Sequence, residues 1–381
     1  MEKFDNIIIG AGIAGLSASL TSMKLGMKTA LIEKNSAPGG TARDCSHNYI
    51  CGLFKNDDTM PFEIANKGLC KDIYKYFFDL YGDKALVKIG KVEVLAFIQE
   101  DLWAFFLNQL KEDNFSFYKN IKHKKTIFTD TCVEKILITT QHNKTVTLSA
   151  DVFINATGSA DLSKKSHDTY LPDAPQSDND QLGGYSIILK GKSKKELSLI
   201  IPYTARKIIE KYNLENYLKF VTISYNFLSD MTVLKFSVQE GQDIEKCHFI
   251  YEKLVGDVKE LANLKYLTSS KRIHLRSCDN LNFNGPNQKE EKTDEECIAK
   301  SYWPAEIWDK NRGTQYKYIK KDNPFCIPVA ALKDKKYNNL FLAGKNIRVP
   351  KLIQASARVM GVCIATGEQA SISAFKSLKE N

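Results

Sequence analysis

The stretch FDNIIIGAGIAG, residues 4–15, decides the fold of this chain. The β-branched run Phe4–Ile9 predicts a strand buried on both faces, and the helical spacing of Ile13–Leu25 predicts a helix ending at Gly26. Between them, residues 10–15 read G-x-G-x-x-G, in the strand–turn–helix context of a phosphate-binding turn. The first glycine allows the tight turn, the second lets a pyrophosphate approach, and the third lets helix and strand pack closely. The helix N-terminus adds N–H groups and a positive dipole end, so the stretch predicts a dinucleotide site.

A carboxylate follows this turn at the position where a ribose is usually bound. The run Thr29–Ile32 predicts a second buried strand, and Glu33 ends it, 18 residues after Gly15. A carboxylate there accepts hydrogen bonds from ribose hydroxyls and repels a 2′-phosphate. The pattern therefore argues against NADP at this site.

Three later glycine-containing segments favour FAD over NAD. They are Gly39-Gly40-Thr41-Ala42, then Ala156-Thr157-Gly158 at the end of a short buried strand, then Gly344 after the strand Leu340–Ala343. A minimal NAD domain would be complete within the first half of the chain. A cofactor that extends from one end of the sheet to the other is expected instead, and FAD has that length.

Composition and charge set broad bounds. The chain has 381 residues, 43% hydrophobic and 26% charged, which is globular composition for two or three domains or one large α/β unit with an insertion. The net charge of +9 comes from lysines spread along the chain, so nucleic acid is not expected as a partner. No apolar run approaches ~18 residues, so no membrane span is expected. The nine cysteines are irregularly spaced without C-x-x-C, which predicts reduced thiols, no metal site and a cytoplasmic protein.

We predict an α/β fold: a three-layer Rossmann-like FAD-binding domain with an inserted mixed α+β substrate domain. The FAD-binding domain is expected to be discontinuous, from residues 1–55, 112–168 and 323–381. Residues 56–111 are expected to form a helical segment, and residues 169–322 the substrate or cap domain.

Within these segments three elements are expected from the pattern of apolar and polar residues. Val92–Glu112 predicts one long amphipathic helix, and Asn282–Glu296 a polar loop. Ala355–Ser377 predicts a helix that follows a loop over Gly344–Gln354.

The sequence resembles FAD-dependent oxidoreductases of the glutathione-reductase-type FAD fold, related more distantly to fumarate-reductase flavoproteins and flavin monooxygenases. The resembling segments are Ile7–Glu33, residues 39–42, Asn155–Leu162, Ile327-Pro328, Asn339–Lys345, Ser356–Gly361 and Ala365–Gly367. They cover roughly a third of the chain. Lys345 stands where the group usually has Arg, a departure that keeps the charge.

The resemblance implies a role for each matching position. The glycines of the turn would hold the pyrophosphate, Glu33 the ribose, and the backbone of Val133 the adenine edge. Gly344 would pass the ribityl chain, and the helix from Ala355 would direct its N-terminus at the flavin N1/O2 edge. Arg358 would add positive charge there or anchor the loop. The implied FAD contacts are Gly10, Gly12, Ala14, Gly15, Glu33, Lys34, Gly40, Thr41, Val133, Thr157, Gly158, Gly344, Lys345, Arg358 and Val359.

The loop over residues 41–53 carries the candidate catalytic groups. His47 would act as a general acid or base, or be a structural residue. Cys45 or Cys51 would be a redox thiol, a covalent flavin attachment point or, as we favour, a small buried hydrophobe. Their C-x5-C spacing differs from the C-x4-C of disulfide reductases of this fold, so a dithiol relay is not expected.

The expected insertion adds two further candidates. Arg272, His274 and Arg276 alternate along the chain and would share one strand face, either as a carboxylate clamp or as a solvated edge. The aromatic stretch Tyr302–Asp309 would wall a pocket or pack the junction between domains.

These residues together predict an enzyme that transfers a hydride between a small organic substrate and tightly bound FAD. The alternatives are a flavin monooxygenase acting on an aromatic or peptide-borne side chain, and a flavin-binding protein without turnover. No second G-x-G-x-x-G occurs, so a dedicated NAD(P)H domain is not expected. The electron donor or acceptor is open, with O2 one candidate, and His47, Cys51 and Arg276 are the candidate catalytic residues.

Overall fold

The computed structural model of the chain describes residues 1–56, 62–111, 113–158, 181–239, 244–276, 297–309 and 311–380. The predicted polar loop at Asn282–Glu296 lies outside these ranges. Among the described residues no helix is long and apolar enough to cross a membrane, and no cluster of potential metal ligands occurs.

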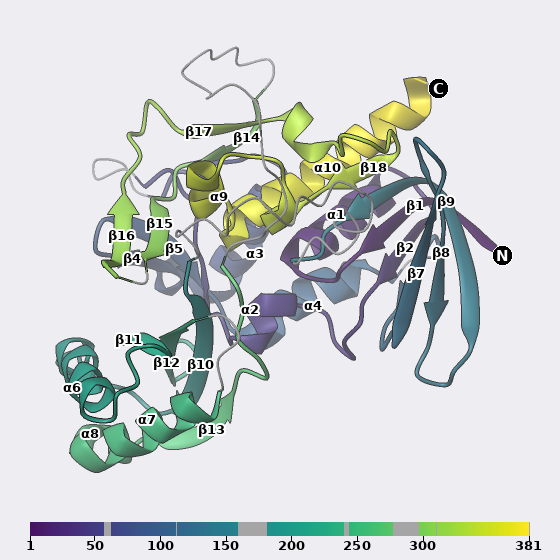
Figure 1. Cartoon of the computed structure of the whole chain (residues 1–381). Coiled ribbons are helices and arrows are strands. Elements are labelled where there is room, and N and C mark those ends of the chain that lie inside the picture. Colours follow the sequence, from purple (N-terminus) through teal and green to yellow (C-terminus); the bar gives the residue numbers. More distant parts are fainter. Residues whose placement is uncertain are drawn as a thin grey trace.

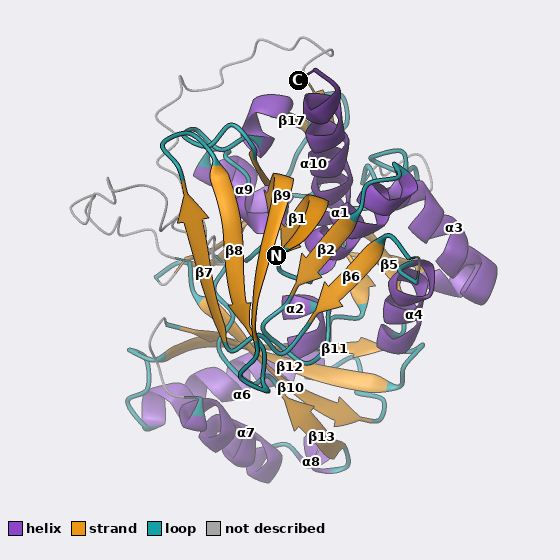
Figure 2. Ribbon diagram, turned by 90° about the vertical axis from the view of Figure 1, so that its right-hand side faces the viewer, coloured by secondary structure: helices purple, strands orange, loops and turns teal. Residues whose placement is uncertain are grey.

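The main sheet is parallel in its centre (Figures 1 and 2). Strand β1 has parallel neighbours on both sides, with Ile7 opposite Ala30 on one side and Phe153 on the other. The strand order is β6-β2-β1-β9-β8-β7, with β18 also paired to β9 and the β7–β8–β9 part antiparallel. The strands are β1 (Glu2–Ile9), β2 (Thr29–Ile32), β6 (Phe115–Tyr118), β7 (His123–Phe128), β8 (Val133–Thr139), β9 (Thr145–Asn155) and β18 (Leu340–Leu342).

Both faces of the parallel strands are buried, and this produces three layers. Ile8 lies in a core with helices α1 (Ile13–Lys24) and α10 (Met360–Glu380), whereas Ile7 packs on the opposite side with Ile136 of β8. A Cβ at Gly367 of α10 would lie 2.3 Å from the carbonyl oxygen of Ala14, so the two helices pack in close contact. The predicted three-layer α/β fold is therefore confirmed.

A second sheet lies at one end of the main sheet (Figures 1 and 2). It is antiparallel, in the order β11-β12-β10-β13, and its helices cover only one face. Tyr185 and Phe236 are fully buried between this sheet and the helices. The elements are β10 (Gly183–Lys190), α6 (Leu197–Lys211), β11 (Leu218–Asn226), β12 (Met231–Val238), α7 (Glu245–Asp257), α8 (Lys259–Ala262) and β13 (Lys265–Ser269). We refer to this sheet with its helices as the cap.

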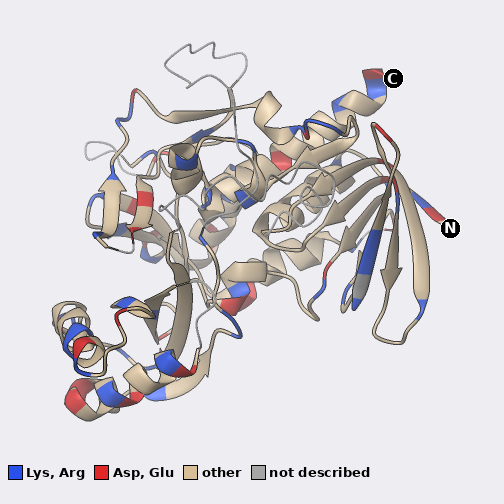
Figure 3. Cartoon of the chain, viewed as in Figure 1, with Lys and Arg blue, Asp and Glu red and all other residues tan. Residues whose placement is uncertain are grey.

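Basic and acidic side chains are interspersed on the outer helices of the cap (Figure 3). Arg206 and Glu210 on α6 form one of these pairs, at 2.8 Å. Both residues are more than half exposed, so such a pair contributes little to stability.

The long helix predicted over Val92–Glu112 is wrong in its first part. Val92–Ala96 is strand β5, which pairs with β4 (Leu86–Ile89) and with β3 (Tyr49–Ile50). The β-branched Val92 and Val94 fit a pleated surface, and cross-strand pairing outweighs the helical spacing of the apolar residues. The helix is α4 (Gln99–Gln109). Helix α3 (Leu69–Tyr81) and the turn η1 (Gly82–Ala85) precede these strands.

The helix predicted over Ala355–Ser377 is also divided. Helix α9 (Lys351–Ala357) ends at Arg358, and α10 begins at Met360. The Gly361 N–H donates to the Cys51 carbonyl at 2.9 Å, instead of to the carbonyl of Ala357 that a continuous helix would use. The loop that precedes α9 contains the short turn η3 (Gly344–Asn346).

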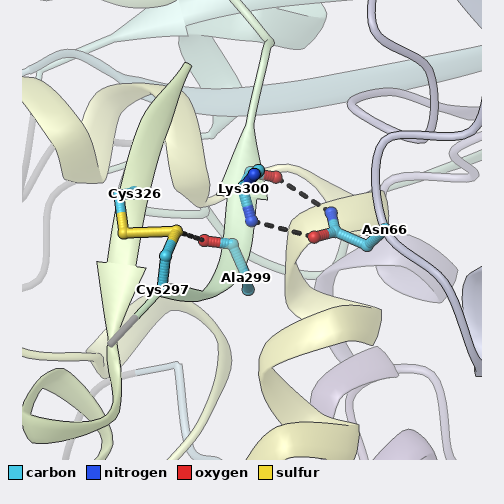
Figure 4. Close-up of a disulfide and its surroundings, with 5 residues drawn as sticks. All are labelled: Asn66, Cys297, Ala299, Lys300 and Cys326. Carbon is cyan, nitrogen blue, oxygen red and sulfur yellow. Dashed lines mark hydrogen bonds between the residues drawn. A yellow bond between two sulfur atoms is a disulfide. The ribbon is translucent and has the colours of Figure 1, made fainter. Parts of the chain in front are cut away.

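A strand pair contradicts the prediction that all thiols are free. Cys297 of β14 (Cys297–Ser301) and Cys326 of β17 (Phe325–Pro328) form a disulfide between adjacent antiparallel strands (Figure 4). The two cysteines are 29 residues apart, a spacing that does not indicate a disulfide. The pairing of their strands brings their Cα atoms to 5.4 Å.

The strand β14 also bears on the expected domain boundaries. Ala299 of β14 lies in the same core as α1 and α10, although it falls within the expected insertion at 169–322. The Asn66 side chain bonds both backbone groups of Lys300 (Figure 4). The remaining elements are α2 (Gly40–Asp44), β15 (Ala305–Asp309), β16 (Gly313–Lys317) and the turn η2 (Val329–Leu332).

Candidate flavin site and its junction with the cap

The glycines of the first turn have three different surroundings. A Cβ at Gly10 would lie 2.9 Å from the Ala156 carbonyl oxygen, and a Cβ at Gly15 would lie 1.8 Å from the Gly10 oxygen. A Cβ at Gly12, by contrast, would have no atom within 4 Å. No side chain caps the N-terminus of helix α1. The turn is therefore tightly packed behind Gly10 and Gly15 and open in front of Gly12. A pyrophosphate requires an open helix N-terminus of this kind.

Two more glycine segments converge on the same place. The Gly39 N–H donates to the Ala11 oxygen at 2.7 Å, and a Cβ at Gly40 would lie 3.2 Å from the Cα of Gly12. Gly344 has φ +73°, and a Cβ there would lie 2.8 Å from the Cβ of Ala14. Backbone thus approaches the turn from three parts of the sequence, and this leaves room for an extended ligand but not for side chains.

Glu33 is buried beside the turn. One carboxylate oxygen accepts the Ala11 N–H at 2.8 Å, and the other accepts the Asn35 N–H at 2.8 Å. Each oxygen retains acceptor capacity for a ribose hydroxyl, because an ionised carboxylate has about four lone-pair positions.

The backbone of Val133, the expected adenine position, is already hydrogen-bonded to a side chain of the protein. The Val133 N–H donates to the side-chain oxygen of Asn339 at 2.9 Å, and the Asn339 amide donates to the Val133 carbonyl at 2.9 Å. An adenine at this backbone would have to displace Asn339. Thr157 lies behind Gly10, bonded through its backbone and hydroxyl to Asn155, and Gly158 lies near the Lys345 side chain.

Several expected FAD contacts reach toward the cap instead. The Thr41 hydroxyl lies 3.3 Å from the Nδ1 of His274, and Lys345 donates to the Leu275 carbonyl at 2.8 Å. Lys34 is exposed, and its charge is among those that lower the pKa of His274. Thr41 and Lys345 therefore connect the surroundings of the glycine turn to residues 274–275.

Arg358 and Val359 occupy the break between α9 and α10. Arg358 donates to the Glu306 backbone carbonyl at 2.9 Å, while its Nε is buried and has no acceptor among the described residues. Burial lowers the pKa of its guanidinium, an effect that the charge of Glu306 opposes. Val359 packs on Gly52, where a Cβ would lie 2.4 Å from its methyl group. The break thus fixes the 51–53 loop against the start of α10.

The candidate groups of the 41–53 loop are uncharged at neutral pH. Burial, with a smaller contribution from the charges of Lys235, Arg276 and Arg358, lowers the pKa of His47 to about 3. Burial also raises the pKa of Cys51 to about 12. A neutral imidazole and a protonated thiol favour hydrogen bonding over proton abstraction or nucleophilic attack.

Cys45, the other cysteine of this loop, is also a protonated thiol. Burial raises its pKa, although the Ser270 hydroxyl donates toward its Sγ at 3.7 Å. Cys45 and Cys51 are both free, so the structure forms no disulfide between them.

The three residues expected on one strand face separate. Residues 270–276 follow β13 without continuing it, and only His274 forms a bridge, to Gly184. Arg272 and His274 approach Asp44 at 3.8 and 3.7 Å. Arg276 turns elsewhere, because the chain after β13 does not keep the strand alternation.

Arg276 lies between the cap and the aromatic stretch. Its Nη1 donates to the Gly183 carbonyl at 2.7 Å and to Leu182, and its guanidinium carbon lies 4.0 Å from the centre of the Trp308 ring. Burial and the neighbouring Arg358 lower its pKa to about 9, so it remains charged at neutral pH.

Two charged residues of this junction were not singled out from the sequence, although Glu306 lies within the expected aromatic stretch Tyr302–Asp309. Lys235 lies on β12, and its charge acts on His47, Cys45 and Cys51. Glu306 lies on β15 and accepts the Trp308 indole N–H at 2.9 Å. Lys235 is one of 47 lysines, and the only signal at this position is that it interrupts an apolar strand pattern.

Several solved structures share this fold, and one of them is named as a flavin-dependent enzyme. A geranylgeranyl bacteriochlorophyll reductase-like protein from Thermoplasma acidophilum has a TM-score of 0.55 at 13% identity, covering 100% of this chain and 80% of that one. The flavin-dependent brominase Bmp2 has a TM-score of 0.50 at 11% identity, covering 100% and 80%. The anhydrotetracycline hydroxylase OxyS from Streptomyces rimosus has a TM-score of 0.50 at 9% identity, covering 97% and 60%. These likenesses concern the fold.

No protein of curated function matches the sequence. A protein family does: residues 5–184 and 275–381 match the family described as FAD dependent oxidoreductase, and these residues contain all three converging glycine segments. The open Gly12, the uncapped helix α1 and the buried Glu33 fit an FAD. The chain belongs to the FAD dependent oxidoreductase family, and it is an enzyme that uses FAD.

Proposed function

We propose that the enzyme exchanges a hydride between FAD and a small organic substrate held between the flavin and the inner face of the cap sheet. The observation that carries this proposal is the direct contact of that face with the 41–53 loop. The Asn226 amide donates to the Asn48 carbonyl at 2.9 Å, and the Tyr49 hydroxyl donates to the Tyr225 carbonyl at 2.9 Å. A sheet without helices on this face has its polar groups directed at the flavin side.

We further propose that FAD lies extended across the main sheet, as in glutathione-reductase-type flavoproteins. Gly12 and the start of α1 would hold the pyrophosphate and Glu33 the ribose. Gly344 would pass the ribityl chain, and the start of α10 would face the flavin ring. When bound, FAD supplies the two-electron acceptor or donor of the reaction.

The chain's own residues would bind, orient and shield the substrate. A thiol relay is disfavoured, because the pKa of each thiol, Cys45 and Cys51, is raised and neither cysteine forms a disulfide. His47, neutral at pH 7, would donate or accept one hydrogen bond to the substrate at a ring nitrogen. The cap sheet would exclude water from the reacting atoms.

The test is anaerobic stopped-flow of the purified holoenzyme. The flavin is reduced, mixed with O2 and followed by absorbance. Slow, direct return of the oxidised spectrum supports the hydride-transfer proposal, and the search turns to an acceptor other than O2. A distinct absorbing transient before that return would replace it with the monooxygenase. A protein that never acquires a flavin spectrum would refute both.

A further inference from the structure

Lys235 lies in the middle of the inner face of the cap sheet. Its neighbours Leu234 and Phe236 are fully buried against the cap helices, so strand alternation directs Lys235 to the opposite face. On that face it lies between Ser186 of β10 and Thr222 of β11. The Ser186 N–H donates to the Ser270 hydroxyl at 3.1 Å. Because Ser270 also contacts Cys45, this face borders the 41–53 loop.

The cations at this junction lack anionic partners. Lys235 is partly buried, and among the described residues no carboxylate forms an ion pair with Lys235, Arg276 or Arg358. Glu306 is the one acid whose charge acts on both arginines, and its carboxylate is already bonded by the Trp308 indole. The two arginines therefore share one acid, and Lys235 has no carboxylate partner among the described residues.

A surplus of partly buried positive charge is unfavourable unless an anion compensates it. We propose that Lys235 and Arg276, with the His47 ring beside them, form a receptor for a carboxylate of the substrate, so that this enzyme acts on an organic acid. This inference rests on the proposed function and names the substrate class of that site.

The hydrogen-bonding groups at the junction favour a carboxylate over a larger anion. Arg276 uses Nη1 to bond the Gly183 and Leu182 carbonyls, which fixes the guanidinium, and no acceptor for Nη2 occurs among the described residues. A fixed guanidinium and a flexible ammonium together match the two oxygens of a carboxylate. Arg358 is bound to the Glu306 carbonyl next to α10, so we assign it to the flavin side rather than to the substrate.

The experiment is a titration of oxidised holoenzyme with benzoate and with succinate, followed by the change in flavin absorbance. Wild-type protein is expected to give a saturable shift. Lys235→Met is expected to raise the carboxylate Kd by about tenfold or more, and Lys235→Arg by less, because it keeps the charge. Lys190→Met is the matched control: Lys190 lies on the same sheet but is exposed at the end of β10, and its loss should leave the Kd unchanged.

Four outcomes would overturn the receptor. They are no saturable shift in wild-type holoenzyme, an unchanged Kd in Lys235→Met, equally tight competition by inorganic phosphate, and a Lys235→Met flavin potential that changes while the carboxylate Kd does not. Far-ultraviolet circular dichroism of Lys235→Met and Lys235→Arg identifies a folding defect. A holoenzyme that keeps FAD yet binds no carboxylate contradicts only this inference, whereas a protein that binds no FAD contradicts the proposed function.

Discussion

The main sheet and the cap sheet interact with their expected ligands in different ways. Around the main sheet, glycines bring backbone to the site, and side chains are excluded at Gly10 and Gly15 by contacts of 2.9 and 1.8 Å. On the cap, charged side chains such as Lys235 and Arg276 face the junction instead. Backbone recognition depends on conformation and leaves a pattern of glycines. Side-chain recognition depends on which distant residues the fold brings together.

The largest expected effect is a loss of FAD binding when an aspartate is introduced beside the main sheet but not when it is introduced in the cap. Gly12→Asp places a carboxylate against the pyrophosphate and should weaken FAD binding by about 100-fold or more. Gly256→Asp, in the cap helix α7, introduces the same charge where a Cβ also meets nothing within 4 Å. That control should retain FAD. A yellow, stoichiometric Gly12→Asp protein would refute our assignment of the turn.

The next effect concerns packing rather than charge. Gly15→Ala forces a Cβ into the Gly10 carbonyl and should destabilise the protein by about 3 kcal/mol. Gly256→Ala has free space in a helix and should stabilise it by about 0.5–1 kcal/mol. Urea unfolding of both variants measures the two values. Equal stabilities would contradict the close approach of α1 to β1.

The third prediction concerns pH. Burial lowers the pKa of His274 to about 4 and that of His47 to about 3, so the unfolded chain binds their protons first as the pH falls. Stability is then complete above about pH 6.5 and is lost toward pH 4, at about 1.4 kcal/mol per pH unit for each histidine.

Urea unfolding of protein without FAD, between pH 4 and 7, measures this dependence. His274→Gln should remove the contribution of one histidine to the pH dependence of the free energy of unfolding. The control His142→Gln, at an exposed position, should leave that dependence unchanged. A slope that His274→Gln does not alter would show that His274 is protonated in the folded protein.

The last prediction concerns the disulfide between Cys297 and Cys326, whose formation removes only two hydrogen atoms from the protein. Protein purified without reductant should leave Cys297 and Cys326 unalkylated, because these two form the disulfide. After reduction all nine should react, and mass spectrometry of the unfolded protein counts them. Nine alkylated cysteines before reduction would restore the expectation of free thiols and support the proposed cytoplasmic location.

The parts of the fold with local causes were predicted well. Strand β2 has the predicted bounds, Thr29–Ile32, because a short apolar run between turns has few alternatives. The helix predicted over Val92–Glu112 failed, since β5 obtains its partners from β3 and β4, which are distant in sequence. The prediction of reduced thiols failed at Cys297 and Cys326 for the same reason, since strands distant in sequence bring these two residues together.

The sequence by itself determined the phosphate turn, the parallel sheet and the use of FAD, because Gly10, Gly12, Gly15 and Glu33 act through local backbone geometry. Only the tertiary structure decided which side chains gather at the junction with the cap. Lys235 and Arg276 both reach the junction because β12 and β13, which Arg276 follows, belong to the same sheet, and the pKa of His47 depends on both charges. Burial and the sum of nearby charges are properties of the assembled molecule, and no short stretch of sequence contains them.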